Sequence, residues 1–181
     1  MRGTRVPRSA RAGRATAVAV GVAIAVGGAG GCSELPEPRR ACVGSSGRVP
    51  ELAREEILGM RPAGATVPRG YEKVDAACWF DSGHAQAYAE RTYAYAGSRE
   101  DVLLYYRTAA EQDGWTQQRA EPDLLCLTRD GDSARTMLTV AFLPADAFAY
   151  DDRKPGPELT AGHPFRVTVS KVLSGDGGCD G

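Results

Sequence analysis

The chain has 181 residues, of which 43% are hydrophobic and 25% charged, and its formal net charge is −1 at pH 7. This composition is typical of a globular protein with a single domain. Five of the 22 basic residues precede residue 15, and all 23 acidic residues lie at Glu34 or later, so the chain from Cys32 onward carries a net charge of −6. Because proteins bind phosphate backbones mainly through Lys and Arg, this balance argues against a nucleic-acid partner.

Residues 1–31 have the three parts of an export signal. An arginine-bearing start without acidic residues precedes an apolar stretch over residues 15–26, and a run of small residues follows over 27–31. The apolar stretch is shorter than the roughly 18 to 20 residues that a membrane-spanning helix needs. We therefore expect residues 1–31 to direct secretion and to be removed.

The sequence at the end of this segment, Ala29-Gly30-Gly31-Cys32, resembles the lipobox of bacterial lipoproteins, in which a cysteine after small residues becomes the new amino terminus. It departs from the usual pattern at Ala29, where a larger aliphatic residue is more common. The resemblance implies a diacylglyceryl group on Cys32, with acyl chains such as palmitate that anchor the protein at the outer face of the bacterial cell membrane. The alternative is cleavage without lipidation, which releases a soluble secreted protein.

The number of cysteines agrees with this interpretation. The chain has five, and lipidation of Cys32 leaves four. An even number suits an exported domain, because thiols in an oxidising compartment are commonly paired. Four cysteines allow three pairings. We expect Cys78 to pair with Cys126, because both fall on predicted strands, and Cys42 with Cys179, because they lie near the two ends of the domain.

The proline-containing residues 32–41 are predicted to be a short extended tether, and residues 42–181 a single disulfide-bonded domain. A short helix is expected at residues 50–58, since Pro50 suits the first helical position and Gly59 can end the helix.

The strongest helical signal covers residues 99–113. Ser98 and Asp101 have the spacing of a capping box, and Gly114 stands where a helix commonly ends in a left-handed conformation. Apolar residues recur at intervals of three and four from Val102 onward, so they share one face.

Runs of alternating residues bounded by turn residues predict the strands. These cover residues 77–80, 86–96, 124–128, 136–143 and 165–172. The order of elements favours an α+β fold, in which an antiparallel sheet of about five strands packs on one main helix, with a short N-terminal helix.

The segment Asp81-Ser82-Gly83-His84 brings together the residue types of a hydrolytic triad. It lacks the sharp strand-to-helix turn that surrounds a nucleophilic serine, and Asp, Ser and Gly are also typical of hairpin turns. We therefore predict no catalytic residue here. The enzymatic alternative is an extracytoplasmic hydrolase in which Asp81, Glu90 and His84 share acid and base roles across the first hairpin.

No metal or other cofactor is expected. His84 and His163 are the only histidines, and neither has a second ligand at the spacing of a zinc site. Asp146, Asp151 and Asp152 could attract calcium, but the spacing of a helix-loop-helix calcium site is absent, which favours a solvated loop.

The long connection at residues 144–164 is the main candidate for binding, because loops of this length in compact domains are commonly functional or disordered. Its candidate binding residues are Phe148, Tyr150, Asp151 and Asp152. The two aromatic side chains could bind a partner or a sugar ring, or instead pack on the edge of the sheet.

A second group of aromatic residues is interpreted as the rim of the core, with a binding groove as the alternative. Its members are Tyr88, Tyr93, Tyr95, Tyr105 and Tyr106. Taken together, the sequence favours a membrane-anchored, non-enzymatic module that binds a surface protein, a wall polymer or a small ligand.

Overall fold

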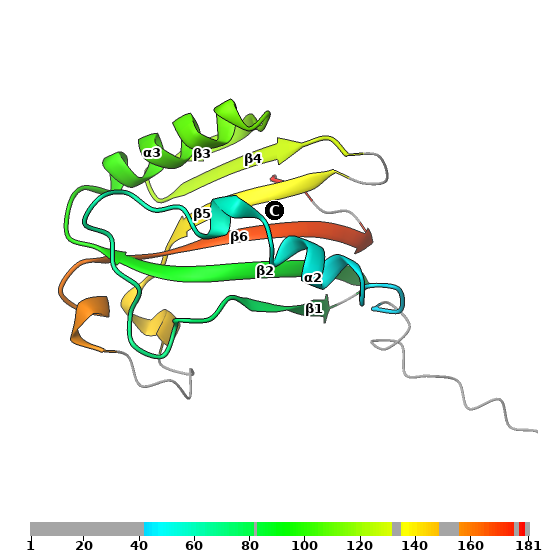
Figure 1. The fold of residues 1–181 in the computed structure, drawn as a ribbon, viewed down its shortest axis with the longest axis horizontal. Helices are drawn as coiled ribbons and strands as arrows, with labels where there is room; N and C mark the ends of the chain where they lie inside the picture. Colours follow the sequence, from blue (N-terminus) through cyan, green and yellow to red (C-terminus); the bar gives the residue numbers. More distant parts are fainter. Residues whose placement is uncertain (1–41, 82, 132–134, 149–155, 176–177, 180–181) are drawn as a thin grey trace, which may run out of the picture. The chain divides into compact units, whose positions relative to one another are not determined.

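The computed structural model describes residues 42–81, 83–131, 135–148, 156–175 and 178–179. These residues form an α+β domain, shown in Figure 1. Its helical elements are α2 (Arg48–Leu52), η1 (Glu56–Leu58), α3 (Arg99–Gln112), η2 (Ala145–Phe148) and η3 (Pro157–Leu159). Its strands are β1 (Asp75–Asp81), β2 (His84–Tyr95), β3 (Thr116–Glu121), β4 (Leu124–Arg129), β5 (Thr136–Phe142) and β6 (His163–Ser174).

The six strands form one sheet in the order β1-β2-β6-β5-β4-β3, and every neighbouring pair is antiparallel. After the β1–β2 hairpin, α3 carries the chain to the far edge of the sheet (Figure 1). Strands β3 to β6 then return one by one, so that the last strand lies beside β2.

The predicted α+β class is confirmed, but the sheet has six strands rather than about five. The strand missing from the prediction is β3, in which five of the six residues are exposed. Since β3 has no alternation of apolar and polar residues, the pattern that reveals a half-buried strand is absent from it.

The short N-terminal helix is divided in two. The predicted helix at residues 50–58 consists of α2 and the separate 3-10 turn η1. Glu55, between them, has an extended ψ of 123°, which interrupts the helical path.

One face of the sheet holds the main core. Helix α3 contacts β3, β4 and β5, whereas α2 contacts β1 and β2 (Figure 1). Six alternating residues of β5 and β6 are buried in this core together with residues of both helices. The six are Leu138, Val140, Phe142, Phe165, Val167 and Val169. Burial of this apolar surface is the main force that holds the helices on the sheet.

The predicted ends of the long helix are confirmed. The Ser98 hydroxyl accepts a hydrogen bond from the backbone N–H of Asp101 at 3.1 Å, and Gly114 has a φ of +78°. Trp115 then turns back on the helix, and its backbone N–H donates to the carbonyl of Ala110 at 3.0 Å.

The four cysteines of the domain are paired, as expected, but the predicted partners are wrong. The disulfides join Cys42 to Cys78 and Cys126 to Cys179, with Cα–Cα distances of 6.0 and 5.7 Å. Cys78 lies on β1 and Cys126 on β4, four strand positions apart, or about 19 Å. Because a disulfide needs Cα atoms within about 7 Å, these two residues cannot be bridged.

The two disulfides attach the ends of the domain to opposite faces of the sheet. Cys78 lies opposite Ala87, a residue of the main core, whereas Cys126 lies opposite Thr139 on the other face. Paired cysteines of this kind are typical of proteins that fold outside the cytoplasm, in an oxidising compartment.

Candidate functional site

The face of the sheet opposite the helices carries the residues that alternate with the core. On β2, Gln86, Tyr88 and Glu90 alternate with buried alanines of the core. Across the strands, Trp79 of β1 lies opposite Gln86, and Thr168 of β6 lies opposite Glu90. Three neighbouring strands therefore present aromatic and polar side chains on one surface.

The described parts of the connection between β5 and β6, η2 and η3, lie at one end of this surface. Phe148 and Leu159 from the loop form a small buried cluster with Ala94 and Tyr71. The backbone N–H of Arg69 donates to a Glu158 carboxylate oxygen at 2.7 Å, and this hydrogen bond lowers the pKa of Glu158 from its usual value. The loop is thus joined to the segment that precedes β1.

Cys179 lies on the same face, over β3 and β4. Cys179 is bonded to Cys126, and the Arg119 guanidinium donates to the carbonyl of Cys179 at 3.2 Å. A bulge between Gln117 and Arg119 turns Arg119 to this face. In a regular strand Arg119 would share the face of Gln117, which lies opposite Leu127 of the core.

A shallow depression of about 310 Å³ lies on this face, on β1, β2 and β6. We call its six lining residues the Trp79 patch: Trp79, Gln86, Tyr88, Glu90, Arg166 and Thr168. Trp79 is 52% exposed, although it lies within a strand. The sheet holds the backbone of all six residues in place, so the patch is formed before any ligand arrives.

The charges in the Trp79 patch compensate each other. An Arg166 guanidinium nitrogen lies 3.2 Å from a Glu90 carboxylate oxygen, and the other oxygen accepts from the Thr168 hydroxyl at 3.5 Å. Both charged side chains are largely buried, so solvent screens this pair less than a pair at the surface. The Arg166 Nε–H is buried and has no acceptor in the described part of the chain.

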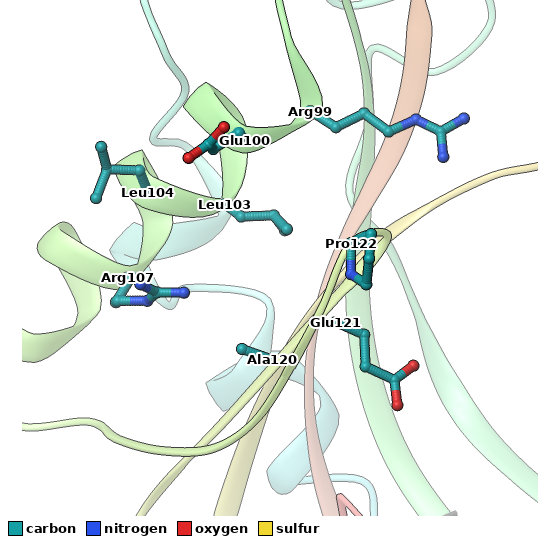
Figure 2. Close-up of a pocket in the computed structure, with 8 residues that line it drawn as sticks. All are labelled: Arg99, Glu100, Leu103, Leu104, Arg107, Ala120, Glu121 and Pro122. Carbon is teal, nitrogen blue, oxygen red and sulfur yellow. The ribbon is translucent and has the colours of Figure 1, made fainter.

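A larger groove of about 620 Å³ lies between α3 and the end of β3 (Figure 2). Leu103 points from the helix toward Pro122, whereas Leu104 points away from the strand. Two basic and two acidic side chains, Arg99, Arg107, Glu100 and Glu121, complete the lining.

This groove is the weaker candidate. Its charged groups sit on long side chains that must be ordered when a ligand binds, which costs conformational entropy. The adjacent edge strand β3 contains the bulge at Gln118, whose side-chain amide donates to the Thr116 carbonyl at 3.4 Å. A bulge disfavours the addition of a further strand. We therefore take the Trp79 patch as the candidate site.

No protein-family model, curated protein or solved structure shows significant similarity to this chain. Within the described residues, no three metal-ligating side chains are grouped closely enough to hold an ion. No helix in the same residues is both long and apolar enough to cross a bilayer.

The residues proposed for a hydrolase do not converge. Asp81 and His84 lie opposite each other at the end of the β1–β2 hairpin. Glu90 lies six residues farther along β2, which is about 20 Å from His84 in an extended strand. Acid and base groups must both reach the reacting atoms, so this set does not form a hydrolytic site.

Of the loop residues predicted to bind a ligand, the structure describes Phe148. Its side chain is only 5% exposed and packs edge-on against Tyr71, with ring centroids 5.9 Å apart. This is the alternative that the sequence left open, in which the ring packs on the edge of the sheet. Tyr150, Asp151 and Asp152 lie outside the described residues.

The tyrosines divide between the core and the candidate site. Tyr93 and Tyr106 are fully buried, and their hydroxyls donate to the carbonyls of Leu58 and Met60 at 2.5 and 2.6 Å. Burial raises the pKa of both tyrosines. These two tyrosines therefore lie inside the core rather than at its rim, while Tyr88 belongs to the Trp79 patch.

Sequence reasoning missed Trp79, Gln86, Arg166 and Thr168 as site residues. Alternation along β2 puts Tyr88 and Glu90 on one face of the sheet. What the sequence did not contain was the pairing of β2 with β6, which brings Arg166 and Thr168 next to them.

Proposed function

We propose that this protein is an exported lipoprotein, anchored through Cys32 at the outer face of the bacterial cell membrane, whose domain binds a ligand through the Trp79 patch without catalysing a reaction. The export-type sequence of residues 1–31 and the lipobox-like segment support the anchor. The two disulfides support folding outside the cytoplasm.

The exposed indole of Trp79 is the observation that carries the proposal of binding. Tryptophan has a large apolar surface, and leaving half of it in water forgoes stabilisation that burial would give. Tryptophan is also enriched among the residues that dominate binding energies. Here it stands beside polar groups of two further strands, which is the composition of a recognition surface.

The composition of the patch also supports a binding role over a catalytic one. Glu90 is the one carboxylate among its six lining residues, and it is ion-paired with Arg166. Glycoside hydrolysis commonly needs two carboxylates, and acyl transfer needs a nucleophile with an adjacent base. Such pairs are not found among these six side chains.

The anchor is tested with the full-length chain produced in a bacterium and labelled with a fatty acid. We expect the wild type to carry the label and to sediment with membranes, and Cys32→Ser to lose both properties. An unlabelled wild-type protein released into the medium would refute the anchor.

Ligand binding is tested by co-sedimentation of the detergent-purified lipoprotein with envelopes from a host strain that lacks the gene. We expect Trp79→Ala to weaken retention at least about tenfold, since loss of a central aromatic contact commonly costs 2 kcal/mol or more. Leu104→Ala is the matched control, because Leu104 is another large apolar residue that is about half exposed and lies on α3. Equal retention of the two variants would refute binding through the patch.

A further inference from the structure

We infer that the ligand of the Trp79 patch is a neutral glycan, with a sugar ring stacked on the indole and its hydroxyls bonded to the polar side chains of β2 and β6. This inference rests on the proposed function, because both use the same surface. It adds the chemical class of the ligand.

The arrangement of the aromatic residues fits sugar rings. Trp79 on β1 lies opposite Gln86 on β2, and Tyr88 lies two residues beyond Gln86 on β2. Trp79 and Tyr88 are therefore diagonal neighbours, with Cα atoms about 7–8 Å apart. A pyranose ring presents C–H groups on its faces and hydroxyls on its edges. The negative face of an aromatic ring attracts these C–H groups, and two neighbouring aromatic residues provide a contact for a chain of rings.

The polar groups of the patch match hydroxyls. The Gln86 amide can donate and accept hydrogen bonds, and the Thr168 hydroxyl, which donates to Glu90, can still accept one. A sugar hydroxyl both donates and accepts, so it can pair with Gln86 in either direction and can donate to Thr168. An uncharged ligand can therefore form hydrogen bonds with the polar groups of the patch.

Electrostatics favour a neutral ligand over an anionic one. The Arg166 charge is already balanced by Glu90 at 3.2 Å, so a phosphate or carboxylate would have to compete with an ion pair. The chain from Cys32 onward also carries a net charge of −6, which repels polyanions. A neutral chain of sugars avoids both costs.

The size of the site favours a glycan over a protein surface. A depression of about 310 Å³ lies at the lower end of the range for small-ligand sites, about 300–1,000 Å³. Phe148 and Leu159 pack beside Ala94 at one end of this face, and Cys179 lies on it over β4. The strip between them suits one or two sugar rings of a linear polymer.

The two tryptophans provide a direct test. Trp79 is 52% exposed and Trp115 only 3%, so in a Trp115→Phe background the emission comes from Trp79 alone. The full-length lipoprotein in detergent is titrated with oligomers of N-acetylglucosamine and with neutral galactan oligomers. We expect at least one of the two to shift the Trp79 emission to shorter wavelength and to reduce its quenching by acrylamide at least twofold.

Variants then assign the contacts, with calorimetry replacing fluorescence where Trp79 is changed. Trp79→Ala is expected to weaken glycan binding at least tenfold and Gln86→Ala several-fold, while Trp79→Phe retains part of it and Leu104→Ala all of it. Polyphosphate and phosphatidylglycerol vesicles are expected to leave the Trp79 emission unchanged.

The outcomes separate this inference from the proposed function. If neither glycan binds while envelope retention still depends on Trp79, the inference of a glycan ligand is refuted, but the proposal that the domain binds a ligand through the Trp79 patch stands. If protease treatment of the envelopes abolishes retention, the ligand is a protein and the glycan is again refuted. A glycan that binds wild type and Trp79→Ala equally also overturns the inference.

Discussion

The guanidinium of Arg129 lies over the indole ring of Trp115, with its carbon 4.4 Å from the ring centroid. The same group donates to both carboxylate oxygens of Glu55 at 2.8 and 2.9 Å and to Asp113 at 2.7 Å. Arg129 on β4 therefore joins the segment before η1 to the C-terminal end of α3. A planar guanidinium can stack on a ring and bind carboxylates at the same time, which an ammonium group cannot do.

Arg129→Lys is accordingly expected to lower the free energy of unfolding by about 1–2 kcal/mol, as measured by urea denaturation under oxidising conditions. Arg135→Lys is the control, because Arg135 pairs with Asp130 and both side chains are well exposed. That change is expected to cost less than about 0.5 kcal/mol. Equal effects of the two changes would show that the contacts of Arg129 add nothing to stability.

Peptide mapping without reduction is expected to find Cys42 linked to Cys78 and Cys126 linked to Cys179. The linked residues are 36 and 53 positions apart, so the loop-closure model gives about 4 kcal/mol of stabilisation for each bridge. Replacement of one pair by serines should lower the unfolding free energy by about 2–4 kcal/mol. A peptide that joins Cys78 to Cys126 would contradict the sheet order, since it requires β1 and β4 to be neighbours.

The disulfides show what the sequence could predict and what it could not. Parity requires only the number of cysteines, so the expectation of two bridges came from the sequence alone. The partners depend on which strands are neighbours and on which face each residue lies. These are long-range properties, and nothing in the residues around Cys78 or Cys126 encodes them.

The same distinction applies to the strands and the site. Helix α3 and strands β2, β5 and β6 have local patterns of period 3.6 or 2, and these patterns located them. Strand β3 has no such pattern, because it is a polar edge held by pairing with β4 on one side. The Trp79 patch could not be predicted from the sequence for a related reason. Trp79 and Arg166 are distant in the sequence, and the strand order β1-β2-β6 brings them onto one surface.

Phe148→Ala is expected to release the loop between β5 and β6 from the sheet. The ring is buried against Tyr71, Ala94 and Leu159, and truncation of a buried phenylalanine commonly costs about 3–5 kcal/mol in a main core and less in a small cluster such as this one. We therefore expect a loss of about 2 kcal/mol and faster proteolysis within residues 144–162. If the loop is cleaved no faster in the variant, its cluster does not hold it in place.

The buried tyrosines predict a loss of stability at alkaline pH. Burial raises the pKa of Tyr93 and Tyr106 in the folded domain, whereas in the unfolded chain both should ionise near 10.0. Above this pH the unfolded chain loses protons that the folded domain keeps, so the unfolding free energy falls as the pH rises and is unaffected by these groups below it. Each such tyrosine contributes a slope of up to about 1.4 kcal/mol per pH unit.

The contribution of Tyr106 can be isolated with Tyr106→Phe, which removes one ionisable group and the hydrogen bond to the Met60 carbonyl. At neutral pH this change is expected to cost about 1 kcal/mol. Between pH 10 and 11, however, the stability of the variant should fall less steeply than that of the wild type, so the two curves approach each other. Parallel curves in brief urea titrations at each pH would mean that Tyr106 ionises as readily in the folded domain as in the unfolded chain, and its hydroxyl would then have to be accessible to water.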